Sequence, residues 1–218
     1  GIQGSLADGN KIQGNYIGTD ISGKGPLGNK IHGISIGGND NIIGGTESGS
    51  GNIIAFNEST GVIVNGNMTG NAILSNSIHS NGGLGIDLDG GTEDDFGVTE
   101  NNAEIEGPNI LQHYPVVESI TYDREEVNIT GSLTGAINTK YNLQFFVNKV
   151  GDESGYGEGQ VYLGSATVET DDYGIASFSE TFPRSTSAEV FTATATDPDG
   201  NTSEFSKGIG GLQSQILA

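Results

Sequence analysis

The chain has 218 residues, with 28 Asp or Glu against 8 Lys or Arg, so its formal net charge is -20 and its pI is about 4.1. Such an acidic surface repels nucleic-acid phosphates and anionic lipid headgroups, and the longest apolar runs of four or five residues are too short to cross a bilayer. These properties exclude a nucleic-acid binder and an inserted membrane protein, and the absence of Cys excludes disulfides, thiolate metal sites and a Cys nucleophile. The chain shows neither an initiator Met nor a signal-peptide pattern, which predicts a mature chain or an excised piece.

Residues 1–106 contain a repeat of Gly, Asn and aliphatic residues. The pattern N-x-I-x-x-N-x-I occurs at residues 10–17 and again at residues 71–78. Asn52 lies 42 residues after Asn10, which we interpret as two units of about 21. A fixed period of this length is typical of a solenoid.

A second motif indicates which kind of solenoid this is. Gly33, Gly61 and Gly85 each begin a short run in which apolar residues alternate, and no window shows helical periodicity. Short strands joined by tight Gly and Asn turns favour a parallel β-helix. Its Ile and Val side chains would point inward, and its Asn side chains would form hydrogen-bonded ladders along the stack.

Residues 116–207 predict a different, antiparallel domain. Two prolines bracket the junction at residues 107–115, and residues 208–218 form an uncharged tail. Alternating apolar residues and hairpin turns predict seven strands, at residues 116–122, 126–133, 141–148, 161–170, 175–182, 189–196 and 202–206. Seven short strands in about 100 residues are typical of an Ig-like antiparallel β-sandwich.

Several of these segments resemble a known family. Residues 15–29 (NYIGTDISGKGPLGN) are similar to the repeat of bacterial and archaeal surface proteins with right-handed parallel β-helix repeats. Residues 83–88 resemble the end of such arrays, and residues 193–205 resemble the Ig-like domain that follows. The resemblance implies an all-β protein: a short right-handed parallel β-helix followed by an Ig-like β-sandwich. It also implies a secreted or cell-surface location and gives no chemistry.

An enzyme is the alternative, because parallel β-helices include enzymes that cleave polysaccharides. Lyases of this kind use a basic residue, often Arg, and residues 1–123 contain no Arg. Hydrolases need carboxylates at a defined separation, and the candidates here are Asp87, Asp89, Asp94 and Asp95. The G-H-G and R-x-K elements of polygalacturonases are absent, so we predict no catalytic residue.

Calcium is the cofactor that the sequence favours. Hard oxygen ligands at alternate positions, with Gly for tight turning, suit Ca²⁺, and two segments have this pattern. The predicted ligands are Asp87, Asp89, Asp94 and Asp95 in the first segment and Asp197, Asp199, Asn201 and Glu204 in the second. Asp152, Glu153 and Glu158 form a weaker third cluster. A solvated loop and an ordinary hairpin turn are the competing interpretations.

The predicted partners follow from the open end of a solenoid. Residues 1–6 contain no capping helix, so further domains of a larger surface protein or another copy of the chain should cover the first coil. The tail at residues 208–218 is a linker or a strand donated to a neighbour, and a head-to-tail contact would build a filament. We therefore expect a non-enzymatic structural or adhesive module stiffened by calcium, and a carbohydrate-binding or polysaccharide-cleaving protein is the alternative.

Overall fold

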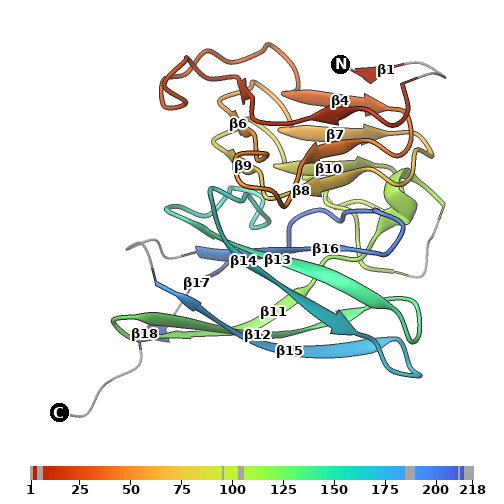
Figure 1. The fold of residues 1–218 in the computed structure, drawn as a ribbon, viewed down its shortest axis with the longest axis vertical. Helices are drawn as coiled ribbons and strands as arrows, with labels where there is room; N and C mark the ends of the chain where they lie inside the picture. Colours follow the sequence, from red (N-terminus) through yellow and green to blue (C-terminus); the bar gives the residue numbers. More distant parts are fainter. Residues whose placement is uncertain are drawn as a thin grey trace.

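The structure is a computed structural model, and it describes residues 2–3, 7–94, 96–102, 106–184, 190–210 and 212–213. Within these residues the chain forms eighteen strands and one short 3-10 turn, η1 (Pro108–Leu111), which confirms the all-β class. The strands form parallel sheets in the first half and mainly antiparallel sheets in the second half (Figure 1). No helix within these ranges is long and apolar enough to cross a membrane.

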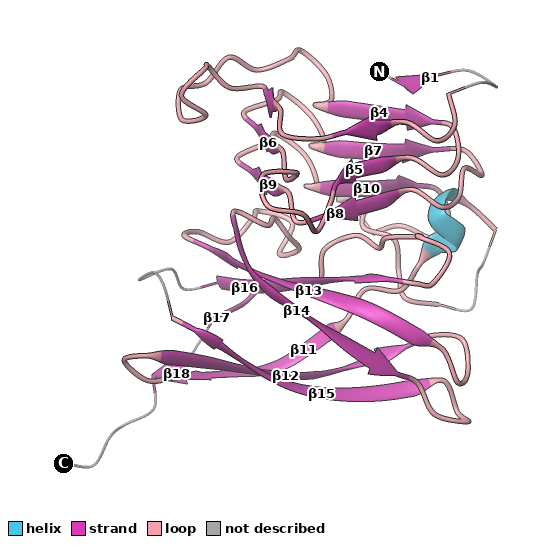
Figure 2. Ribbon diagram, in the orientation of Figure 1, coloured by secondary structure: helices cyan, strands magenta, loops and turns pink. Residues whose placement is uncertain are grey.

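Three parallel sheets make up the first half, and the chain passes through them in turn. The sheets contain, in spatial order, β1 (Ile2–Gln3), β4 (Ile34–Gly37), β7 (Val62–Asn65) and β10 (Ile86–Asp89); β2 (Lys11–Ile12), β5 (Ile42–Gly44) and β8 (Ala72–Leu74); and β3 (Tyr16–Ile17), β6 (Ile53–Ala55) and β9 (Ser77–His79). Each pass through the three sheets is one coil. Figure 2 shows the coils as rows of strands stacked above the rest of the molecule, and we call them the coil stack.

Aliphatic side chains fill the interior of the coil stack. In the first sheet Ile34 pairs with Val62 and Val62 pairs with Ile86, so the strands that follow Gly33, Gly61 and Gly85 lie in register, as the motif predicted. All three side chains are buried in one core. A side chain in one coil therefore rests on its counterpart in the next coil, which buries apolar surface in every pair.

Three columns of asparagine run along the coil stack. In each column the backbone N–H and the side-chain Nδ2 of one Asn both donate to the Oδ1 of the Asn in the following coil, at 2.8 to 3.2 Å. The columns are Asn10–Asn41–Asn71, Asn15–Asn52–Asn76 and Asn29–Asn57–Asn81. Because all donors point the same way, each column has an acceptor end in the first coil and a donor end in the last coil.

Two four-stranded sheets form the second half, which we call the two-sheet half. Their spatial orders are β15 (Ile175–Pro183), β12 (Glu126–Thr134), β11 (Val116–Tyr122) and β18 (Leu212–Gln213), and β14 (Val161–Glu169), β13 (Lys140–Asn148), β16 (Val190–Thr196) and β17 (Ile209–Gly210). All pairs are antiparallel except β11 with β18. One core of buried residues lies between the sheets, where Phe145 contacts Phe178 and Phe182 with ring centroids 5.5 and 5.1 Å apart.

The seventh predicted strand, at residues 202–206, is wrong. Only Thr202 forms an isolated bridge, with Thr196, and the rest of the segment is irregular. The N–H groups of Ala193 and Ala195 on β16 donate to the side-chain hydroxyls of Ser206 and Ser203, and not to backbone carbonyls. Side chains of the same segment contact the coil stack, through Thr202, Glu204 and Phe205.

The first part of the tail belongs to the chain's own sheets. Strand β17 pairs with β16, and β18 pairs with β11, so residues 209–210 and 212–213 extend the two sheets at their edges. Residues 211 and 214–218 lie outside the described residues. In the part that the structure describes, the tail extends its own domain rather than a neighbour.

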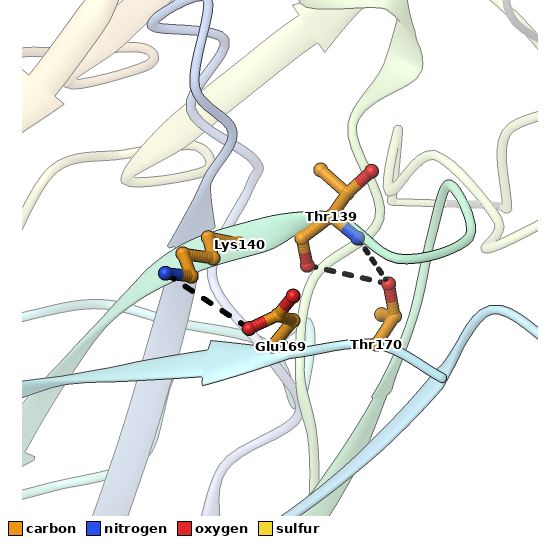
Figure 3. A network of polar contacts seen from close by, with 4 residues as sticks. All are labelled: Thr139, Lys140, Glu169 and Thr170. Carbon is orange, nitrogen blue, oxygen red and sulfur yellow. Dashed lines mark hydrogen bonds and ion pairs between the residues drawn. The ribbon is translucent and has the colours of Figure 1, made fainter. Parts of the chain in front are cut away.

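A polar contact closes one end of the β13–β14 pair (Figure 3). The Thr139 N–H donates to Thr170 Oγ1 at 3.0 Å, and Lys140 Nζ lies 4.0 Å from Glu169 Oε2. This is the single ion pair found between described residues. Both of its side chains are largely exposed, and an exposed pair contributes little to stability.

Candidate functional site: the junction between the coil stack and the two-sheet half

In the last coil, one edge each of β8, β9 and β10 has no further strand of the coil stack to pair with, and these edges face the two-sheet half. An unpaired strand edge presents N–H groups that need acceptors. On β8, Ile73 N donates to Thr202 Oγ1 at 3.0 Å, and just after it Ser75 N donates to Gln144 Oε1 at 2.8 Å. Gln144 and Thr202 are fully buried, so these bonds replace water at the edge.

Asn109 of η1 ends the first Asn column. Its Oδ1 accepts the Asn71 N–H at 3.1 Å, and its Nδ2 donates to the carbonyls of Asn71 and Thr202 at 2.8 and 2.9 Å. Asn109 has a φ of 45°, in the left-handed region that Asn tolerates. The segment expected to be a linker is thus buried at Pro108, Asn109 and Leu111 and closes the coil stack.

Glu158 ends the third Asn column. Its Oε1 accepts the backbone N–H and the Nδ2 of Asn81 at 3.1 and 3.0 Å, and its Oε2 accepts the Ser80 N–H. The next residue, Gly159, exchanges two backbone hydrogen bonds with Ile78 of β9, at 2.9 and 2.8 Å. A carboxylate from the two-sheet half therefore stands where the next Asn of the column would be.

Glu204 serves the first sheet in the same way. Its Oε1 accepts the Leu88 N–H of β10 at 2.9 Å, and its Oε2 accepts the Thr99 N–H at 2.9 Å. The Thr99 hydroxyl adds a third donor, 3.2 Å from Oε1. The carboxyl is almost fully enclosed, with the residue 2% exposed, so these protein donors stand where water would otherwise bond to it.

Aromatic side chains close the apolar core beneath these carboxylates. Phe146 and Phe205, from the two-sheet half, belong to the same buried cluster as Ile86 and Leu88 of the coil stack. Their ring centroids lie 5.3 Å apart with the planes nearly perpendicular. Leu111 of η1 joins them. The core of the coil stack is therefore completed by residues from the second half of the chain.

Burial perturbs three carboxyls at the junction. It raises the pKa of Glu158 to about 7 and the pKa of Glu204 to about 8, although N–H donors oppose the shift in both cases. Burial also raises the pKa of Asp87 to about 6, against a hydrogen bond from the Thr60 hydroxyl. Raised carboxyl pKa values are typical of general acids, so the position of each group decides what it can do.

The first predicted calcium segment is spread over several environments. Asp87 is half-buried beside Thr60, and Asp89 is exposed. Asp94 accepts the N–H groups of Phe96 and Val98 at 2.8 and 3.0 Å, which organises the turn. Asp95 lies outside the described residues.

The second predicted segment separates into two sites. Asp197 Oδ1 accepts the N–H groups of Asp199 and Asn201 at 2.9 and 2.8 Å, whereas the Glu204 carboxylate faces Leu88 and Thr99. Asn201 Oδ1 accepts the Gly70 N–H of the coil stack at 2.6 Å. Across the described ranges no group of three or more His, Asp or Glu side chains could hold a metal ion, and calcium binding stays a prediction.

Two cavities border the junction. One of about 650 Å³ is lined by Tyr141, Tyr173, Asp197 and Asp199 among others, and the Tyr173 side chain is 86% exposed. A second, of about 380 Å³, is bordered by Glu158 and by residues that include His79, Asp152 and Lys149. Burial lowers the pKa of His79, which favours its neutral form. Sequence reasoning singled out neither cavity.

Two comparisons with known proteins found no match. No protein-family model matches the sequence, and a search of the curated proteins finds no significant match.

Most residues that form this junction were not predicted for this role. Glu158 and Glu204 were predicted as calcium ligands, and Asn109 and Gln144 were not predicted as functional residues. For Asn109 the sequence offered a signal, because Asn109 is an Asn that follows the Asn-rich repeat and could continue the column of Asn10, Asn41 and Asn71. Gln144 lies within an alternating strand and carries no such signal.

Proposed function

We propose that the chain is a non-enzymatic structural module of a secreted or cell-surface protein. In this proposal the coil stack is a short right-handed parallel β-helix, and the two-sheet half is an Ig-like β-sandwich that closes its last coil. The ordered passage through three parallel sheets and the two antiparallel sheets over one core support this assignment. The acidic surface, with a net charge of -20, keeps such an exposed module soluble.

The observation that carries the proposal is the use of the two buried carboxylates. Glu158 and Glu204 accept strand-edge N–H groups from the coil stack, and each has three donors from the chain itself. A catalytic acid must reach its substrate, whereas Glu204 is only 2% exposed. The raised pKa values thus have an architectural explanation.

Alanine substitution of the two carboxylates tests the proposal. Glu158→Ala and Glu204→Ala leave buried N–H groups without acceptors, so each should lower the free energy of unfolding by about 1–3 kcal/mol in denaturant titration. Glu126→Ala, at an exposed position of β12, is the control and should change it little. Turnover of any neutral or anionic polysaccharide that Glu158→Ala abolishes in a folded protein would contradict the proposal.

One observation favours the carbohydrate alternative. The cavity of about 650 Å³ combines the exposed Tyr173 ring with the carboxylate of Asp199, and a sugar-binding face needs exposed aromatic side chains. In the same screen, a carbohydrate ligand should lose affinity with Tyr173→Ala and keep it with Tyr16→Ala, which removes an exposed ring outside the cavity. Binding unaffected by Tyr173→Ala would remove the cavity from consideration.

Calcium remains part of the proposal as a stabilising ion. Because Asn201 and Glu204 bond to the coil stack, the proposal now rests on Asp87, Asp89, Asp94 and Asp95. A ligand that binds only the folded state raises the melting temperature. Melting in millimolar calcium and in chelator should therefore differ, and equal melting temperatures would contradict calcium binding.

A further inference from the structure

The end of the coil stack away from the two-sheet half has a chemical polarity. Each Asn column starts there, at Asn10, Asn15 and Asn29, and all three residues are exposed. In later coils the Oδ1 at these positions accepts two N–H groups from the preceding coil. For Asn10, Asn15 and Asn29 no donor to Oδ1 is found in the part of the chain that the structure describes. This end therefore presents acceptors.

The same end carries exposed apolar side chains. Tyr16, Ile21, Leu27 and Ile31 are 52%, 95%, 71% and 63% exposed. All four lie in β3 or in the loop that follows it, and Figure 1 shows this loop at the same end of the stack as β1. Four exposed apolar side chains within one segment of 16 residues, next to open strand edges, indicate an interaction surface.

A second copy of this chain does not fit the surface. Two such ends placed face to face would bring Oδ1 acceptors against Oδ1 acceptors. The complementary donor end belongs to the last coil, and there Asn109 already accepts the Asn71 N–H and Glu158 accepts the N–H and the Nδ2 of Asn81. Stacking the first coil of one copy on the last coil of another would require the two-sheet half to detach.

We propose that this end, defined by Asn10, Asn15, Asn29 and the exposed residues 16–31, docks one kind of partner. The partner is a parallel β-coil whose uncovered end offers Asn amide and backbone N–H donors at the same three positions. This inference rests on the proposed structural function and specifies its contact. The predicted filament of identical chains stacked head to tail is therefore given up. In its place we propose a contact between this end and a different parallel β-coil.

An added coil tests the inference within the full chain. Residues 62–86 are duplicated directly before Gly1. The register of the first sheet, Ile2 with Ile36, Ile36 with Val64 and Val64 with Leu88, then places the copy of Ile86 opposite Ile34. Copies of Asn71, Asn76 and Asn81 fall above Asn10, Asn15 and Asn29. Hydrogen exchange should show the amides of the added coil protected.

The control extension carries Asn71→Asp, Asn76→Asp and Asn81→Asp in the added copy only. Carboxylates accept but do not donate, so this coil should exchange about tenfold faster or more, since three hydrogen bonds are lost. Equal exchange in the two extensions would overturn the inference. So would a dimer of the unextended chain, in sedimentation, that Tyr16→Ala dissociates, because the partner would then be a second copy. Neither result alters the stability test of Glu158 and Glu204, so the two proposals can fail separately.

Discussion

Whether a column of asparagines continues into another coil depends on the hydrogen-bonding groups of the side chain that follows its last Asn. Asn carries both a donor and an acceptor, so each Asn serves the coils on both sides of it. Glu158 carries only acceptors when ionised, and it meets the donor end of the third column. An acceptor-only group satisfies the last donors and offers nothing to a further coil. The chemistry of this one residue is therefore suited to ending the stack.

The buried carboxylates predict a pH dependence of stability. Glu158 and Glu204 have folded-state pKa values of about 7 and 8 against an ordinary value of 4.5. At pH values between the unfolded-state pKa and the folded-state pKa, each carboxyl is protonated in the folded state and ionised in the unfolded state. The free energy of unfolding should therefore fall as pH rises from about 5 to about 8. At about 1.4 kcal/mol per pKa unit, the fall amounts to a few kcal/mol.

Denaturant titrations across this pH range measure the effect. Glu204→Gln has no titrating carboxyl and should show a shallower slope than the parent chain. Glu126→Gln, on the exposed face of β12, changes the net charge equally and should keep the parent slope. Identical slopes for all three proteins would mean that general charge repulsion, and not the buried carboxyls, causes the dependence.

Glycine is required where successive coils approach most closely. A Cβ on Gly33 would lie 2.6 Å from the Gly61 carbonyl oxygen, and a Cβ on Gly61 would lie 2.6 Å from the Gly85 carbonyl oxygen. Both distances are far inside van der Waals contact. On Gly85 the neighbour is instead the Phe205 ring, at 2.9 Å. The absence of a side chain at these Gly residues thus allows the start of each strand to pack closely on the next coil, or on Phe205 in the last coil.

Gly61→Ala tests this packing rule. The new methyl group would meet backbone on one side and the Ile78 side chain, at 2.7 Å, on the other, so the free energy of unfolding should fall by about 1–3 kcal/mol. Gly151→Ala is the matched control, because its Cβ would have only ordinary contacts at 3.7 and 3.8 Å. Calorimetric melting of both variants gives the comparison, and an unchanged Gly61→Ala protein would contradict the rule.

The two halves of the chain form one packed unit. The core of the coil stack contains Phe146 and Phe205 of the two-sheet half, and backbone and side-chain bonds join the halves along all three parallel sheets. The last coil would otherwise expose both its apolar interior and its strand edges. We therefore expect the coil stack and the two-sheet half to unfold together in one transition.

Phe205→Ala tests this coupling. The side chain is 3% exposed, and its loss leaves a cavity at the end of the coil stack, so a cost of about 3–5 kcal/mol is expected. Hydrogen exchange should rise in the coil stack as well as in the two-sheet half. Val150→Ala, at a side chain that is 76% exposed, is the control. Faster exchange confined to the two-sheet half would show that the halves are independent.

The repeat could be recognised in the sequence, but which Asn residues occupy equivalent positions in successive coils could not. The strands after Gly33, Gly61 and Gly85 pair in register as predicted. The interpretation of Asn10 and Asn52 as equivalent residues two units apart is wrong, because Asn52 accepts from Asn15 in another column. The second coil has extra residues between Asn41 and Asn52, and loop length does not alter which strands can pair.

The sequence by itself determined the all-β class, the paired rungs of the coil stack and six of the seven strands predicted for the two-sheet half. These features arise from local alternation and repetition, which neighbouring residues display directly. Only the tertiary structure decided what Asn109, Gln144, Glu158 and Glu204 do. Their partners lie 38 to 116 residues away in the chain, and a lone Glu in a loop looks the same whether it binds an ion, faces solvent or receives the last N–H group of a sheet.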